Sequence, residues 1–84
     1  MTRYTGTWHG QAEQDLADIW LSSSDREGIT AAVEAIDLAL ATAAESKGNA
    51  IAEGLRALNS PPLRVLFVPR THDCIAEVVF VRQI

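Results

Sequence analysis

The chain has 84 residues, and 7 lysine and arginine side chains against 11 aspartate and glutamate side chains give it a formal net charge of −4. This length excludes a two-domain enzyme, because single domains usually span about 100–150 residues. A hydrophobic content of 48% excludes an intrinsically disordered chain. The one cysteine, Cys74, excludes an internal disulfide and a cysteine-rich zinc site and is typical of a reducing, cytoplasmic setting. We therefore expect a single cytoplasmic domain over residues 1–84, and the acidic total argues against a surface coated with positive charge.

The charge is unevenly distributed along the chain. Residues 1–42 hold two basic and seven acidic side chains, a net charge of −5, whereas residues 43–84 carry a net charge of +1. The two halves therefore need separate interpretations, and any anion-binding surface is expected in the second half.

The first half predicts a strand followed by two helices. Residues 3–9 are β-prone, and from Gln11 the apolar side chains recur at helical spacing until the serines at 22–24. Ser24 and Glu27 form a capping box that opens a second helix, which we expect to continue to Gly48. The apolar face of this helix is expected to hold Ile29, Val33, Ile36, Leu40 and Ala43. The helices are predicted to form an antiparallel hairpin in which each covers the apolar stripe of the other.

The second half predicts three strands over residues 55–58, 63–68 and 74–82. Pro61 and Pro62 lie in the first turn, where their missing backbone donors cost nothing. Short turns between sequential strands are typical of an antiparallel meander. The predicted fold class is therefore α+β, in the order β-α-α-β-β-β, with the N-terminal helical hairpin packed on a small antiparallel sheet.

Arg64 interrupts an otherwise apolar strand, and an unpaired buried guanidinium would cost several kcal/mol. We therefore expect either a salt bridge to a helix carboxylate or an anion site on the sheet, for a phosphate or for the carboxylate of a partner. Arg56 on the preceding strand and Arg82 on the following one are candidates to join Arg64 on one surface. Alternation places Arg82 on the face that holds Ala76, Val78 and Phe80.

The other chemically notable side chains have structural interpretations. We expect His9 to cap the first helix, His72 to lie in a solvated turn, and Cys74 to be a small buried residue. Trp8 and Trp20 are expected in the core. No nucleophile lies at a spacing that suggests a catalytic triad, and the carboxylates show no pattern of metal ligands, so neither a metal nor a cofactor is expected.

Three segments resemble motifs of one toxin superfamily. Residues 12–20, AEQDLADIW, resemble the A-x-x-D-L-x-x-I-W motif of the RelE/ParE toxins. Residues 54–58, GLRAL, and 62–68, PLRVLFV, resemble the sheet segment G-x-R-x-L … P-x-R-V-x-F/Y-x-V of that family. The element order agrees as well, so the resemblance covers essentially the whole chain.

This resemblance implies a cytoplasmic toxin of a type II toxin–antitoxin system, a growth inhibitor with a role in plasmid stabilisation that a cognate antitoxin neutralises. RelE-like members cleave mRNA in the ribosomal A site, whereas ParE-like members block DNA gyrase. In a nuclease, Arg64 would stabilise the charge at the scissile phosphate, and Arg56 and Arg82 would be the further catalytic residues. In either case Arg56, Arg64 and Arg82 are the expected partner-binding residues, and the antitoxin is expected to be acidic where it covers Arg64.

The sequence departs from the RelE-like pattern in ways that favour a ParE-like function. Only Arg56 stands where those nucleases carry several lysines. The chain ends at Gln83 and Ile84 without the basic and aromatic tail of the nucleases. His72 is a poor substitute for the general acid or base that cleavage needs. Three hypotheses follow: a toxin that does not cleave RNA, a ribosome-dependent mRNA endoribonuclease with a reduced site, and a non-toxic protein-binding module.

Overall fold

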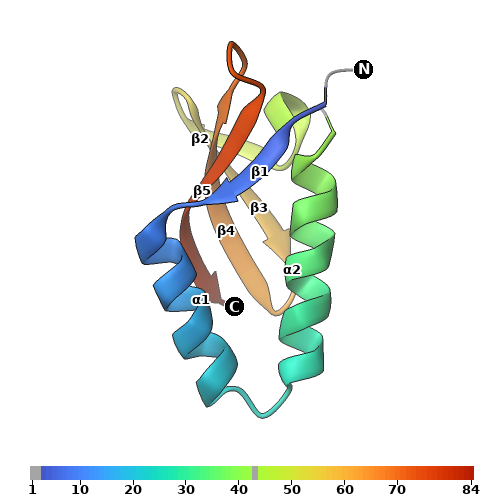
Figure 1. Ribbon diagram of the computed structural model, residues 1–84, viewed down its shortest axis with the longest axis vertical. Helices are drawn as coiled ribbons and strands as arrows, with labels where there is room; N and C mark the ends of the chain where they lie inside the picture. Colours follow the sequence, from blue (N-terminus) through green and yellow to red (C-terminus); the bar gives the residue numbers. More distant parts are fainter. Residues whose placement is uncertain (1–2, 43) are drawn as a thin grey trace.

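The computed structural model describes residues 3–42 and 44–84 and contains two long helices and a mixed β-sheet (Figure 1). The elements in chain order are β1 (Thr5–Trp8), α1 (Gly10–Ser22), α2 (Arg26–Leu40), the 3₁₀ turn η1 (Ala44–Ser46), β2 (Asn49–Ala52), β3 (Leu55–Ser60), β4 (Leu63–Arg70) and β5 (Ile75–Gln83). This is an α+β fold, as expected. No helix among the described residues is long and apolar enough to cross a membrane.

The sheet has the strand order β1-β5-β4-β3-β2. The meander β3-β4-β5 is antiparallel as predicted, but β1 pairs with β5 in parallel, so the expectation of an all-antiparallel sheet was wrong. Strand β2, which pairs with β3, was not predicted, because its sequence NAIA has no polar–apolar alternation. All four of its residues are exposed.

The helix boundaries follow from side chains that cap them. The Nδ1 atom of His9 accepts a hydrogen bond from the Gln11 amide and opens α1, so the predicted capping role of His9 is confirmed. Helix α2 begins after Asp25, whose carboxylate accepts from the Gly28 amide, and the predicted Ser24–Glu27 capping box was therefore wrong. The helix also ends at Leu40, well before Gly48.

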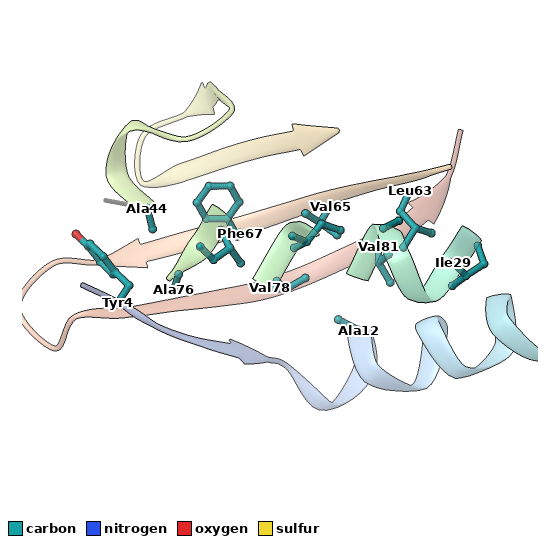
Figure 2. Packing of buried hydrophobic residues seen from close by; sticks show 13 residues of the cluster. Tyr4, Ala12, Ile29, Ala44, Leu63, Val65, Phe67, Ala76, Val78 and Val81 are labelled. Carbon is teal, nitrogen blue, oxygen red and sulfur yellow. The ribbon is translucent and has the colours of Figure 1, made fainter. Parts of the chain in front are cut away.

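The core lies between one face of the sheet and the two helices (Figure 2). Strands β4 and β5 contribute alternate side chains, and α2 contributes the predicted Ile29, Ile36 and Leu40 together with Ala32. Val33 is half-buried against this cluster, and Ala43 lies outside the described residues. Two hydrogen bonds tie the sheet to α2: Trp8 Nε1 donates to Asp37, and the Ser60 hydroxyl donates to a carbonyl of the helix.

The helices run antiparallel, but their apolar stripes cover the sheet more than they cover each other. Ala12 of α1 is fully buried against the core, whereas Trp20 near the other end of this helix is 39% exposed. The expected core position of Trp20 was therefore wrong, while Trp8 is partly buried against the core. A groove remains between the two helices.

A β-bulge in β5 changes which side chains face the helices. Phe67 pairs with Val78 and Leu66 pairs with Phe80, so Val79 has no partner on β4. Because one inserted residue reverses the alternation, Val78 and Val81 both point into the core, and Phe80 points to the opposite face.

Candidate partner-binding surface

The candidate functional site is the open face of the sheet, on the side away from the helices. Directly opposed residues on neighbouring strands point to the same face of a sheet. The pairs Arg64–Arg82, Leu66–Phe80 and Val68–Glu77 therefore lie on the open face, in alternation with the buried pairs of the core.

Arg64 and Arg82 lie directly opposite each other on β4 and β5. The Arg64 side chain is half-buried and donates from Nη1 to the Asn59 side-chain oxygen at 3.0 Å, while Arg82 is exposed. Neither forms a salt bridge with a carboxylate of the described residues, so the alternative of a salt bridge from Arg64 to a helix carboxylate was wrong. The helices lie on the other side of the sheet, which makes that partner unreachable.

The sequence alternation gave Arg82 three neighbours on its face, of which Phe80 is confirmed and Ala76 and Val78 were wrong. Ala76 and Val78 are fully buried in the core, whereas Arg82 shares the open face with Phe80. The bulge at Val79 accounts for the difference, since the register of β5 shifts by one residue between Val78 and Phe80. Without this bulge Arg82 would point toward the helices and away from Arg64.

Arg56 does not join the other two arginines. It pairs with the buried Phe67 and so lies on the helix side of the sheet, where its Nε donates to the Lys47 carbonyl at 2.6 Å and its Nη2 donates to the Gly48 carbonyl at 3.1 Å. The expected surface of three arginines therefore holds only two of them, Arg64 and Arg82. Arg56 instead holds the loop between η1 and β2 against β3.

Apolar side chains extend from the arginine pair along the open face. Leu66 and Val68 are half-buried, and Phe80 is 43% exposed at the centre of this face. At the far end Arg70 forms a 2.8 Å salt bridge with Glu77, the one carboxylate that the five strands carry. The site residues predicted from sequence did not include Phe80, although the alternation placed Phe80 on the same face as Arg82.

The side chains suited to acid–base chemistry lie elsewhere. His72 and Cys74 belong to the turn between β4 and β5, six or more residues from Arg64 along β4, a distance of about 20 Å in a strand. His9 caps α1 on the helix side. Cys74 is half-buried, and it lies in the turn and not at the start of β5. Among the described residues, no three metal-ligating side chains gather in one place.

The single tyrosine of the chain, Tyr4, is buried in the core. Interaction with the Glu45 carboxylate, together with burial, raises the pKa of Tyr4 to about 12, and the same interaction lowers the pKa of Glu45. The buried Tyr4 hydroxyl itself has no hydrogen-bond partner of good geometry among the described residues. Both groups lie near the start of the sheet and the turn η1, away from the arginine pair. They are therefore not part of the candidate site.

Comparison with known proteins supports the fold. No protein-family model and no curated protein sequence matches the chain. The structure is similar to a chain of the toxin–antitoxin complex RelBE2 from Mycobacterium tuberculosis, with a TM-score of 0.80 and 18% identity over 100% of this chain and 94% of that one. It is also similar to a chain of the chromosomal ParDE toxin–antitoxin system from P. aeruginosa, with a TM-score of 0.69 and 18% identity over 100% and 99%. The chain therefore has the RelE/ParE-like fold that its sequence motifs indicated.

Proposed function

We propose that this protein is the toxin of a type II toxin–antitoxin system, a growth inhibitor that a cognate antitoxin neutralises, and that it acts by binding its target and not by cleaving RNA. The proposed target is DNA gyrase, as for ParE-like toxins. Two solved toxin–antitoxin complexes with the same fold support the coarse assignment.

The observation that carries the choice of mechanism is the chemistry around Arg64 and Arg82. Cleavage of RNA by 2′-hydroxyl attack needs a general base and a general acid within hydrogen-bond reach of the reacting atoms. The open face carries one carboxylate, Glu77, which is engaged by Arg70 and lies five residues from Arg82 along β5, about 16 Å in a strand. Both histidines and the tyrosine lie off this face. The pair is suited to hold an anion but lacks proton-transfer partners.

The surface around Arg64 and Arg82 is suited to a partner protein that supplies the anion as a carboxylate. Leu66, Val68 and Phe80 form an apolar strip beside the two guanidinium groups. Protein interfaces combine apolar anchors with arginines in this way, and aromatic residues and arginine are enriched among the residues that carry most of the binding energy. A partner segment with one or two carboxylates and a few apolar side chains fits this face.

The second candidate function is a ribosome-dependent mRNA endoribonuclease. The observation that favours it is the same pair of guanidinium groups without carboxylate partners, since arginines stabilise the charge that develops on a phosphoryl group. In that case proton transfer would have to come from the ribosome or from the RNA itself.

Induced expression in a host without the antitoxin tests these proposals. We expect growth arrest, relief of the arrest by co-expression of a cognate antitoxin, inhibition of supercoiling by purified gyrase, and no new mRNA ends in primer extension. The double variant Arg64→Ala/Arg82→Ala is expected to lose inhibition, and Arg70→Ala, which removes a charge already engaged by Glu77, serves as the matched control. New mRNA ends that disappear in the double variant would establish the nuclease instead. Normal growth of cells that contain folded protein would point to the non-toxic binding module.

A further inference from the structure

Strand β2 forms an open edge of the sheet. It is the outermost strand on the side of β3, and none of its four residues makes a backbone hydrogen bond with a described residue outside the β2–β3 pair. The N–H and C=O groups along its outer side can therefore pair with another strand. The opposite edge differs, because the Tyr4 amide, just before β1, donates to the Ala41 carbonyl and ties that edge to the end of α2.

The side chains of β2 give little protection against such pairing. All four residues, in the sequence NAIA, are exposed, and none is charged or a proline. Natural sheets commonly block an open edge with lysine or proline. Ile51 is 48% exposed, and the β-bulge at this position leaves it without a partner on β3. The edge therefore carries unpaired backbone groups together with an unpartnered apolar side chain.

Both ends of this edge are fixed by contacts within the chain. The Arg56 guanidinium donates to the carbonyls of Lys47 and Gly48, immediately before β2, at 2.6 and 3.1 Å. At the other end a two-residue turn, Glu53 and Gly54, joins β2 to β3. A strand that is already ordered loses less conformational entropy when it pairs than a flexible segment does.

Charged side chains of opposite sign flank the uncharged strand. Lys47 precedes β2 and Glu53 follows it, and neither forms a salt bridge with a described residue. In an antiparallel pair of two copies with Ala50 on the two-fold axis, Lys47 of each copy lies opposite Glu53 of the other. This register also places Asn49 opposite Ile51 and brings the two small Ala50 side chains together. The edge is therefore complementary to itself in charge and in size.

We propose that two copies of this chain pair through β2 as antiparallel strands and so join their five-stranded sheets into one continuous sheet. The two-fold axis of such a pair is perpendicular to the sheet, so the helices of both copies lie on one side. Both open faces, each with its Arg64 and Arg82, lie on the other side. The dimer thus presents two candidate sites on one surface, which favours a two-fold symmetric partner through avidity. This pairing does not depend on the proposed target.

The dimer is expected to be weak. A four-residue strand pair buries less surface than the roughly 1,200 Å² of a stable interface, and the bulge shortens the regular part of the edge. We therefore expect sedimentation equilibrium to detect dimers at chain concentrations of about 0.1–1 mM. The acidic total does not oppose this contact, because residues 43–84, which include β2, carry a net charge of +1.

A cysteine on the proposed axis reports the pairing directly. In a Cys74→Ser background, Ala50→Cys places the two introduced thiols opposite each other, with Cα atoms about 5 Å apart, a separation that a disulfide can span. The matched variant Ala52→Cys, at the other exposed alanine of β2, places them about 13 Å apart along the strand, which is too far. With oxidised glutathione as the oxidant, we expect Ala50→Cys to form a covalent dimer at least about tenfold faster than Ala52→Cys.

Charge reversals at the two ends test the register. Lys47→Glu and Glu53→Lys each replace two attractions with two repulsions and should weaken association by about tenfold. The double variant Lys47→Glu/Glu53→Lys should restore it. A mixture of the two single variants should associate more tightly than either variant alone, because both end contacts are then attractive.

Two lysine substitutions separate the edge from general stickiness. Ile51→Lys in β2 should weaken association, whereas Leu38→Lys, at a leucine of α2 that is 75% exposed, should leave it unchanged. Circular dichroism checks that each variant is folded.

Three results would overturn the proposal. They are equal cross-linking rates of Ala50→Cys and Ala52→Cys, a double charge reversal that associates no better than the single ones, and a chain that stays monomeric at about 1 mM. Weaker association in Leu38→Lys but not in Ile51→Lys would also overturn it, because the copies would then meet through their helices.

Discussion

The charge reversal Arg82→Glu is expected to stabilise the fold while it removes the function of the open face. Arg64 and Arg82 are direct cross-strand partners and have the same charge. Two unit charges about 6 Å apart in water repel by about 0.7 kcal/mol, and physiological salt reduces this roughly by half. Reversal replaces repulsion with attraction of similar size, so the free energy of unfolding should rise by about 0.5–1 kcal/mol. For a domain of 84 residues this corresponds to an increase in Tm of about 3–6 °C.

Urea and thermal unfolding at low and high salt measure this effect. The gain should shrink in 1 M NaCl, where the Debye length falls to about 3 Å. In the parent chain Glu77 forms a salt bridge with Arg70. The control variant Arg70→Glu replaces this partner with a second negative charge and should lower the free energy of unfolding. Growth arrest and antitoxin binding should be lost in Arg82→Glu. A variant that is less stable than the parent would refute the reasoning, because it would mean that Arg82 stabilises the fold through contacts of its own.

Three further predictions concern the fold. Gly48 and Gly54 both have a positive φ, but a Cβ at Gly48 would collide with a backbone oxygen of β3, whereas a Cβ at Gly54 would meet nothing. In urea titrations, Gly54→Ala should lower the free energy of unfolding by roughly 1 kcal/mol, and Gly48→Ala should lower it by well more than that. Arg56→Gln should cost about 1–3 kcal/mol, because two carbonyls lose charged donors, and it should leave antitoxin affinity unchanged in calorimetry. The lowered pKa of Glu45 means that its contribution to stability is present above the ordinary pKa near 4.5 and is lost as the pH falls through the folded-state value. The raised pKa of Tyr4 gives a contribution that is present below pH 10 and is lost as the pH rises through about 12, so Glu45→Gln should flatten the pH dependence of Tm at both ends.

The two helices and every strand except β2 could be predicted in their order, because the hydrophobic pattern of each of these segments has a single period. In β4, Leu63, Val65 and Phe67 lie in the core and Arg64 lies on the other face, as simple alternation along a strand requires. Helix α2 likewise buries the residues at its apolar spacing. In these segments one face meets the core throughout, so burial repeats with the period of the backbone.

The candidate site was predicted only in part because it depends on register. The bulge at Val79 lies in the apolar run VVFV, where no glycine or polar residue marks an inserted position, and it decides on which face Phe80 and Arg82 lie. The face of Arg56 likewise depends on its pairing with Phe67. Pairing between strands is a tertiary property, and a shift of one residue reverses every side chain beyond it.

The parallel pairing of β1 with β5 has a consequence for the order of folding. Thr5 pairs with Ile75, so this contact closes a loop of about seventy residues, whereas the meander β3-β4-β5 forms from neighbouring segments. Contacts between distant segments carry the larger entropic cost and slow folding, so we expect β1 to dock after the meander and the helices have assembled. Until then the edge of β5 is unpaired and open to strands of other chains. Amides of β1 should accordingly exchange hydrogen earlier than those of β4. Expression at high level should favour aggregation through the unpaired edge of β5.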